Sequence, residues 1–226
     1  MKAFCSVSRC AKSVQLRRCV RGATRRRKVD GGLALPSTLK KSRRTIKTRA
    51  PVVRPLILTI GHSTRTIEAF IELLRANGVR RLVDVRTIPR SRHNPQFNRD
   101  TLPKTLRHAG IGYTHMKELG GLRHARKDSS NTGWRNSSFR GFADYMQTPE
   151  FAAGLETLIQ AANVEQIAIM CAEAVPWRCH RSLIADALMV RGCSAVHIMS
   201  RSRTQPHALT SFAKVRGTHI TYPAVE

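Results

Sequence analysis

Residues 56–86 read LILTIGHSTRTIEAFIELLRANGVRRLVDVR, and this stretch decides the fold class. The short apolar run over 56–61 predicts a buried strand. The apolar residues that follow recur at helical spacing, with Thr66 as the expected N-cap and Gly78 closing the helix. A second apolar run over 81–86 predicts another strand. The stretch is therefore a βαβ unit, whose crossover we expect to be right-handed.

The same alternation continues along the chain. Downstream we expect helices over 101–108, 139–147, 149–162 and from Pro176 to Gly192, and strands over 112–116, 166–171, 195–199 and 219–222. Segment 118–138 is rich in turn residues and is expected as a long loop. Alternating strands and helices predict an α/β fold: a single three-layer domain with a mostly parallel sheet and helices on both faces.

Positive charge is concentrated at the start of the chain. Residues 1–55 hold 17 Lys and Arg against one acid, Asp30, so they carry +16 of the formal net charge of +26. This tail has no sustained apolar period, which predicts disorder. An organelle presequence and sequence upstream of a misplaced start are both favoured over a nucleic-acid-binding arm. The α/β domain is expected over 56–226.

The apolar runs are too short to span a membrane, and the N-terminus lacks a secretory apolar core. We therefore expect no membrane partner and a cytoplasmic location, with organelle targeting by the Arg-rich tail as the alternative. Three of the six cysteines lie in the tail and three in the body, and this odd number favours reduced thiols. The oligomeric state is left open.

Ligands of parallel sheets bind beyond the carboxyl ends of the strands, so residues that follow the expected strands are the candidates. The side chains expected to bind an anion are Ser63, Arg86, Arg90, Arg178 and Arg181. Arginines bind phosphate through paired N–H groups, and the last two are expected to share a face at the positive end of a helix. The competing interpretation is a solvated basic rim.

Four residues are candidates for catalysis: His62, Asp84, Cys171 and Glu173. Glu173 or His62 would act as acid or base, and the two carboxylates could instead orient arginines. A cysteine that ends a strand before a loop and an arginine resembles the nucleophile of thiol phosphatases and sulfurtransferases. Here six residues rather than five separate Cys171 from Arg178, and the loop lacks glycine. A small buried residue is therefore the favoured interpretation of Cys171.

Cys171, Cys179 and His180 could instead bind a metal or exchange electrons. If a helix begins near Pro176, the side chains of residues 179 and 180 point about 100° apart, and the chain has no paired Cys-x-x-Cys spacing. A metal site is therefore not favoured, and the cofactor stays unknown. His197 lies inside an expected strand and is predicted to be a hydrogen-bonded core residue rather than a catalyst.

Five blocks together resemble a known family: TIGHSTRTIEAFIELL, LVDVRTIPRSRHNPQF, GIGYTHMKELGG, FADYMQTPEF and CAEAVPWRCHRSLIADAL. In this order and spacing they are similar to the domain of unknown function 488 family, over residues 56–199. The resemblance implies an α/β fold, leaves the basic tail outside, and supplies no substrate, cofactor or catalytic residue.

The leading functional hypothesis is an enzyme that acts on a phosphate-bearing substrate, a nucleotide or a nucleic acid, in a basic crevice. One alternative is a non-catalytic nucleic-acid-binding module that neutralises backbone phosphates. The other is a metal-binding or redox protein built on the cysteines and His180.

Overall fold

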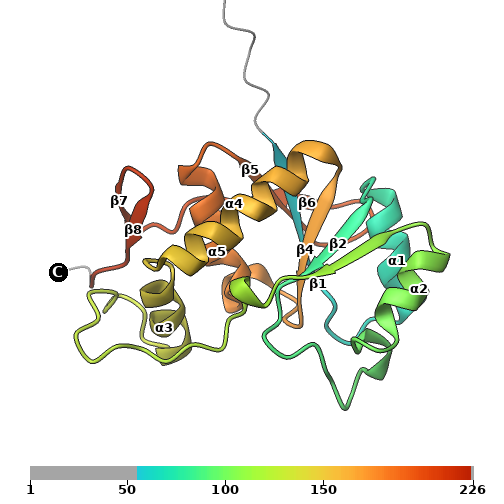
Figure 1. Cartoon of the computed structure of the whole chain (residues 1–226), viewed down its shortest axis with the longest axis horizontal. Coiled ribbons are helices and arrows are strands. Elements are labelled where there is room, and N and C mark those ends of the chain that lie inside the picture. The colour runs from blue at the N-terminus through green and yellow to red at the C-terminus, as the bar shows by residue number, and fades with distance from the viewer. Residues whose placement is uncertain (1–54, 225–226) are drawn as a thin grey trace, which may run out of the picture. The chain divides into compact units, whose positions relative to one another are not determined.

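The computed structural model describes residues 55–224. The expected basic tail, apart from Pro55, lies outside the described residues. Six strands form one sheet in the order β3-β2-β4-β1-β5-β6, in which only β6 runs antiparallel to its neighbour (Figure 1). Their bounds are β1 Leu56–Gly61, β2 Arg81–Asp84, β3 Gly112–His115, β4 Ile167–Cys171, β5 Ser194–Ile198 and β6 Thr204–Pro206.

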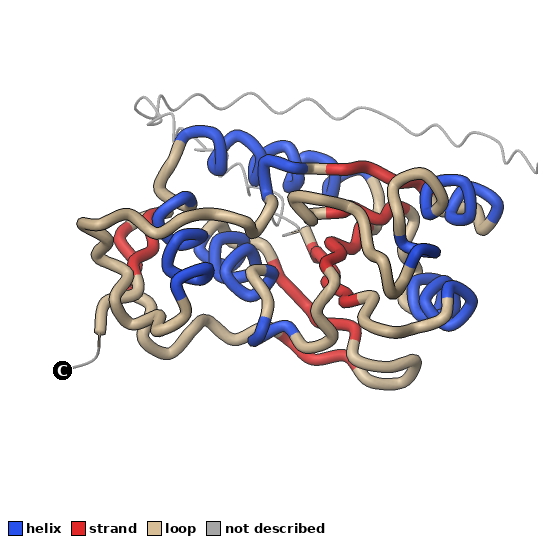
Figure 2. Tube along the Cα trace, turned by 90° about the horizontal axis from the view of Figure 1, so that it is seen from below, coloured by secondary structure: helices blue, strands red, loops and turns tan. Residues whose placement is uncertain are grey.

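Five α-helices connect and cover the strands: α1 Ile67–Ala76, α2 Leu102–His108, α3 Ser137–Tyr145, α4 Pro149–Val164 and α5 Arg181–Val190. Figure 2 shows helices on both sides of the sheet. Three short 3₁₀ turns, Pro95–Phe97, Lys117–Leu119 and Pro176–Arg178, lie in the connections. A small hairpin follows, made of β7 Lys214–Arg216 and β8 His219–Thr221. No helix within residues 55–224 is long and apolar enough to cross a bilayer.

The alternation of side chains along the central strand builds two apolar cores. On β1, Ile57 joins the cluster under α3, α4 and α5, whereas Leu58 and Ile60 join the cluster under α1 and α2. Successive residues of a strand point to opposite faces, so an uninterrupted apolar run is what a strand covered on both faces requires. The predicted α/β class with a mostly parallel sheet is confirmed.

The caps of α1 agree with the sequence prediction. The Thr66 hydroxyl accepts a hydrogen bond from the Ala69 backbone N–H, and Gly78 has a φ of 66° after the last turn. Both ends of this first helix are therefore encoded locally.

The predicted start of the last helix is wrong. Residues 176–178 form a separate 3₁₀ turn, Cys179 is extended (φ −138°, ψ 143°), and α5 begins only at Arg181. Strands β6 and β7 were not predicted, because they are three residues long, exposed and polar, and β6 ends in Pro206 at the sheet edge. The predicted strand over 219–222 corresponds to β8.

Candidate functional site at the carboxyl edge of the sheet

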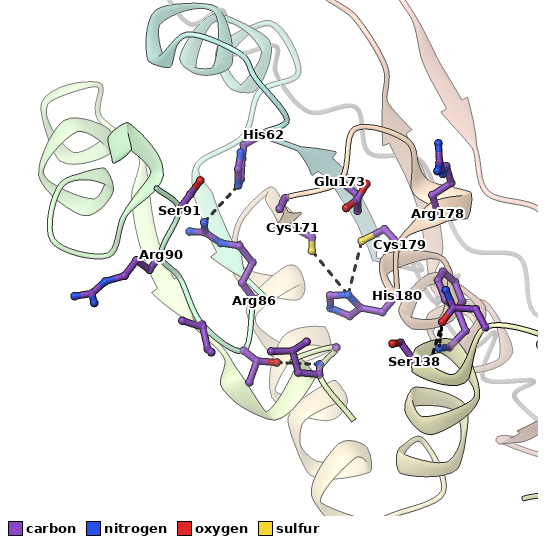
Figure 3. Close-up of a pocket in the computed structure, with 17 residues that line it drawn as sticks. His62, Arg86, Arg90, Ser91, Ser138, Cys171, Glu173, Arg178, Cys179 and His180 are labelled. Carbon is purple, nitrogen blue, oxygen red and sulfur yellow. Dashed lines mark hydrogen bonds between the residues drawn. The ribbon is translucent and has the colours of Figure 1, made fainter. Parts of the chain in front are cut away.

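A pocket of about 410 Å³ lies where β1, β2 and β4 end. Six of the residues singled out from the sequence as catalytic or anion-binding line it: His62, Arg86, Arg90, Cys171, Glu173 and Arg178. Cys179 and His180 line the same pocket, and Figure 3 shows these eight side chains around one space. Segments far apart in the sequence therefore meet at the carboxyl edge of the sheet, as the parallel topology requires.

Ser63, Asp84 and Arg181 do not line this pocket. Ser63 has a φ of 49°, and its backbone N–H donates to the carbonyl of Ala172, so it joins the β1 turn to the loop after β4. Asp84 and Arg181 are buried behind the pocket wall. The prediction that Arg178 and Arg181 share a helical face is wrong, because α5 begins after Arg178.

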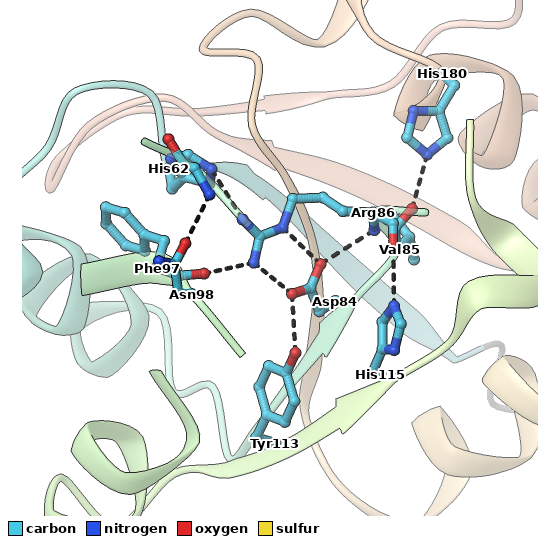
Figure 4. A network of polar contacts seen from close by, with 10 residues as sticks. His62, Asp84, Val85, Arg86, Phe97, Asn98, Tyr113, His115 and His180 are labelled. Atoms are coloured by element: carbon cyan, nitrogen blue, oxygen red, sulfur yellow. Dashed lines mark hydrogen bonds and ion pairs between the residues drawn. The ribbon is translucent and has the colours of Figure 1, made fainter. Parts of the chain in front are cut away.

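Arg86 is fixed by a buried ion pair (Figure 4). Its Nε–H donates to Asp84 Oδ1 at 2.9 Å and its Nη2 to Asp84 Oδ2 at 2.6 Å, while Nη2 also donates to the carbonyl of Phe97. Tyr113 donates its hydroxyl to the same carboxylate, and burial followed by the charge of Asp84 raises the pKa of Tyr113. Asp84, with no exposed surface, therefore orients the arginine.

His62 presents a neutral nitrogen to Arg86. Its Nδ1–H donates to the carbonyl of Ser63 at 2.9 Å, which leaves Nε2 as the acceptor for Arg86 Nη1 at 3.4 Å. The ring stacks on Phe97 with 4.4 Å between centroids. Burial, with a contribution from the positive charge of Arg86, lowers the pKa of His62 to about 4, so the ring is uncharged at neutral pH.

Cys171, Cys179 and His180 form a compact cluster on the pocket wall. The Nδ1 atom of His180 lies 3.8 Å from Cys171 Sγ and 3.7 Å from Cys179 Sγ (Figure 3). All three side chains can meet because Cys179 is extended and His180 is the N-cap of α5 rather than an interior helical residue. The sequence argument that residues 179 and 180 diverge depended on a helix that is not there.

The two sulfur atoms differ in character. The hydrogen bond with Cys179, together with burial, raises the pKa of the Cys171 thiol well above its usual value. Burial acts the same way on Cys179, but the hydrogen bond with Cys171, together with the contact with His180, outweighs it and lowers the pKa of Cys179 well below its usual value. Of the two cysteines, Cys179 therefore has the lower pKa.

Two glycines permit the close packing around this cluster. A Cβ at Gly61 would overlap the carbonyl oxygen of Glu173, which the loop after β4 presses against the end of β1. A Cβ at Gly121 would lie 2.5 Å from His180 Nδ1. Both positions therefore need glycine for lack of space rather than for backbone conformation.

Arg181 anchors the cluster from behind. It is 1% exposed and donates through Nε to Cys179 Sγ at 3.4 Å, through Nη2 to the carbonyl of Glu173 at 2.6 Å and through Nη1 to Thr59 at 3.2 Å. Within residues 55–224 no carboxylate forms an ion pair with it. A buried cation needs a nearby negative group, and the Cys179 sulfur meets this need.

A chain of buried hydrogen bonds continues from Thr59. Its hydroxyl lies 2.8 Å from His197 Nδ1, His197 Nε2 lies 3.0 Å from His207 Nδ1, and His207 Nε2 lies 2.8 Å from Asp186 Oδ1. Asp186 also accepts from the hydroxyls of Thr210 and Tyr222. The prediction that His197 is a hydrogen-bonded core residue is confirmed.

The predicted loop 118–138 supplies pocket residues that the sequence did not single out. These are Gly121, Leu122, Asn136 and Ser138. Asn136 also caps α3, accepting from the backbone N–H of Ser138 at 2.8 Å. The unusual length of the turn-rich segment was the available signal, but nothing in its composition identifies which residues face the pocket.

One comparison with known proteins identifies the family. The model described as "Domain of unknown function DUF488" matches residues 66–188, just over half of the chain. The chain belongs to this family. The match confirms the resemblance seen in the sequence blocks, and it covers Arg86 and the whole cysteine and histidine cluster of this DUF488 protein, whereas His62 precedes it. Searches of curated proteins and of solved structures gave no match.

Proposed function

We propose that this DUF488 protein is an enzyme that acts on a phosphate-bearing substrate, a nucleotide or a nucleic acid, held in the pocket at the carboxyl edge of the sheet. The observation that carries the proposal is the presence of arginines, a carboxylate and a thiolate–imidazole cluster on the walls of one concave site. Its volume of about 410 Å³ falls within the usual range for ligand pockets, about 300–1,000 Å³.

Arg86 is the best-prepared anion ligand. Its Nε and Nη2 donors are used by Asp84 and Phe97, and Nη1 donates one of its two N–H groups toward His62. The second Nη1–H has no partner among residues 55–224, and the side chain lines the pocket. A donor held in place before the ligand arrives loses little entropy on binding. Arg90 and Arg178 are exposed at the same pocket and add positive charge.

Glu173 is the proposed acid or base. Its backbone carbonyl is held by Arg181, and its exposed carboxylate forms no hydrogen bond or ion pair within the described part of the chain, so it is available to contact a ligand. His62 suits this role less well, because a pKa of about 4 leaves it without a proton to donate at neutral pH and makes its free nitrogen a weak base. In this proposal His62 orients the arginine or accepts a ligand hydrogen bond.

Binding is tested first. Inorganic phosphate and 5′-nucleoside monophosphates are titrated into the protein by calorimetry. Loss of one charge-assisted hydrogen bond should weaken binding by about tenfold in Arg178→Ala or Arg90→Ala. Arg75→Ala is the matched control, since this arginine is exposed on α1 and does not line the pocket. Equal losses in all three variants would contradict the pocket.

Catalysis is tested separately with Glu173→Gln, which keeps the shape of the side chain and removes its charge. Phosphate release or transfer from nucleotide and oligonucleotide substrates should fall at least about a hundredfold while binding is retained. If no substrate is turned over, and DNA binding responds equally to Arg178→Ala and Arg75→Ala, the protein is a binding module that neutralises backbone phosphates.

A further inference from the structure

Three soft ligand atoms converge on one point of the pocket wall. The Sγ atoms of Cys171 and Cys179 and the Nδ1 atom of His180 all lie within 4.8 Å of one another. We propose that these three side chains bind a zinc ion. Two thiolates and an imidazole are a preferred ligand set for zinc, and three protein ligands leave one coordination position open.

The spacing of the three atoms agrees with tetrahedral zinc. Zn–S bonds of about 2.3 Å and Zn–N bonds of about 2.0 Å at a tetrahedral angle separate sulfur from nitrogen by about 3.5 Å. The two observed separations are 3.8 Å and 3.7 Å. Each sulfur–nitrogen separation would therefore shorten by only a few tenths of an ångström, and the two sulfurs, which lie within 4.8 Å of each other, would come to about 3.8 Å.

The orientation of His180 is the one that a metal ligand requires. Its Nε2–H donates to the carbonyl of Val85 at 3.2 Å, which fixes the tautomer and leaves the Nδ1 lone pair facing the two sulfurs. The ring also contacts Phe142 edge-on at 5.0 Å between centroids, and Gly121 packs against the ring beside Nδ1, Cγ and Cε1. Three separate elements therefore hold this imidazole in one position.

The charges of the cluster also suit a divalent cation. The two sulfurs are buried and close together, so both can be thiolates only if positive charge lies between or beside them. Arg181 donates to Cys179 Sγ from behind, on the side away from the pocket. Zinc between the sulfurs would supply the remaining positive charge and pair both thiolates.

The open coordination position faces the pocket, since Cys171, Cys179 and His180 all line it. A water molecule or a ligand oxygen would complete the coordination there, beside Glu173 and the arginines. Use of the zinc in catalysis rests on the proposed function, whereas zinc binding itself depends only on the three side chains.

The test measures metal directly. The full chain is expressed with zinc in the medium, purified without chelator and under reducing conditions, and its metal content is determined by mass spectrometry. We expect about one zinc per chain. His180→Ala and Cys179→Ser should each fall below about a tenth of that content, because two ligands hold zinc poorly. Cys193→Ser is the matched control: Cys193 is also buried and free but lies outside the cluster, and should keep its zinc.

A second measurement does not depend on the variants. Unsubstituted protein reconstituted with Co²⁺ should show the intense visible bands of tetrahedral cobalt and its thiolate charge-transfer absorption. Absence of both zinc and these bands overturns the proposal. Full zinc retention by folded His180→Ala also overturns it, and so does a disulfide between Cys171 and Cys179 that persists under reducing conditions. Arg178→Ala should keep its zinc, so failure of phosphate binding and failure of metal binding give different results.

Discussion

At the scale of single residues, Asp84 has the most sharply defined role. The sequence left two roles open, an acid or base and a partner that orients arginine. The structure gives the carboxylate two contacts with the Arg86 guanidinium, one with the Arg86 backbone N–H and one with the Tyr113 hydroxyl, and no exposed surface. Its lone pairs are thus occupied by donors that hold Arg86 at the pocket wall.

Removal of this carboxylate should destabilise the protein. Asp84→Ala leaves the buried Arg86 without a charged partner, and we expect the free energy of unfolding to fall by about 3–5 kcal/mol. The measurement is urea unfolding followed by circular dichroism. Glu165→Ala is the control, because its ion pair with Arg81 is partly exposed and should contribute less than about 1 kcal/mol. Similar losses in both variants would show that burial of the Asp84 pair has no special effect.

At the scale of elements, local patterns predicted what local interactions determine. The buried run of β1 and the Thr66 cap of α1 are visible in the sequence because apolar alternation and capping act within a few residues. The break before α5 is different. Pro176 is a good first helical residue, but Arg181 bonds to the Glu173 carbonyl and to Cys179, and His180 bonds to Val85. These hydrogen bonds hold Cys179 in an extended conformation, and no local sequence pattern predicts them.

For the candidate site, the sequence predicted the position in the fold but not the directions of the side chains. Because ligands of parallel sheets bind beyond the carboxyl ends of the strands, the sequence alone placed four residues at one edge of the sheet: His62, Arg86, Cys171 and Glu173. A metal site at Cys171, Cys179 and His180 was not favoured from the sequence, because its geometry depends on the backbone conformation of residues 179 and 180. Residue types at strand ends can be read from the pattern, but the directions of their side chains depend on packing.

The close approach of the loop after β4 to β1 gives a test at this scale. In Gly61→Ala the new methyl group would overlap the Glu173 carbonyl, so the loop must move and Arg181 loses an acceptor. We expect a loss of about 2 kcal/mol or more in urea unfolding. Gly112→Ala, in β3, is the matched control: its methyl group meets only the movable end of the Arg81 side chain, at 3.1 Å, and should cost less than about 1 kcal/mol. A Gly61→Ala variant as stable as this control would contradict the tight packing.

At the scale of the whole molecule, buried polar groups connect the pocket to the C-terminal segment. The path runs from Arg181 through Thr59 and His197 to His207 and Asp186, whose carboxylate also accepts from Tyr222. Every link has a donor and an acceptor when His197 is neutral. Burial disfavours a positive charge on His197, and this ties the stability of the fold to pH.

Acidification should expose this dependence. Burial, followed by the charge of His207, lowers the pKa of His197 from 6.5 to about 4 in the folded protein. Between these values the unfolded chain binds the proton and the folded protein does not, so the free energy of unfolding falls as the pH decreases from about 6.5 to about 4. His197→Asn, which keeps an acceptor for Thr59, should reduce this slope by about half in urea unfolding measured at a series of pH values, because His62, whose pKa is also lowered to about 4, contributes the rest. His93→Gln removes an exposed histidine and should leave the slope unchanged; equal slopes in all three proteins would refute the assignment.

The position of β1 in the sheet has a consequence for synthesis on the ribosome. This strand is made first among the described elements, yet it lies at the centre of the sheet, and its partner strands β4 and β5 begin only at Ile167 and Ser194. Thr59 and its register partner His197 are 138 residues apart in the chain. The backbone N–H and C=O groups of β1 thus stay unpaired until most of the polypeptide has been translated, and through that interval the nascent chain presents an apolar strand that is prone to aggregation.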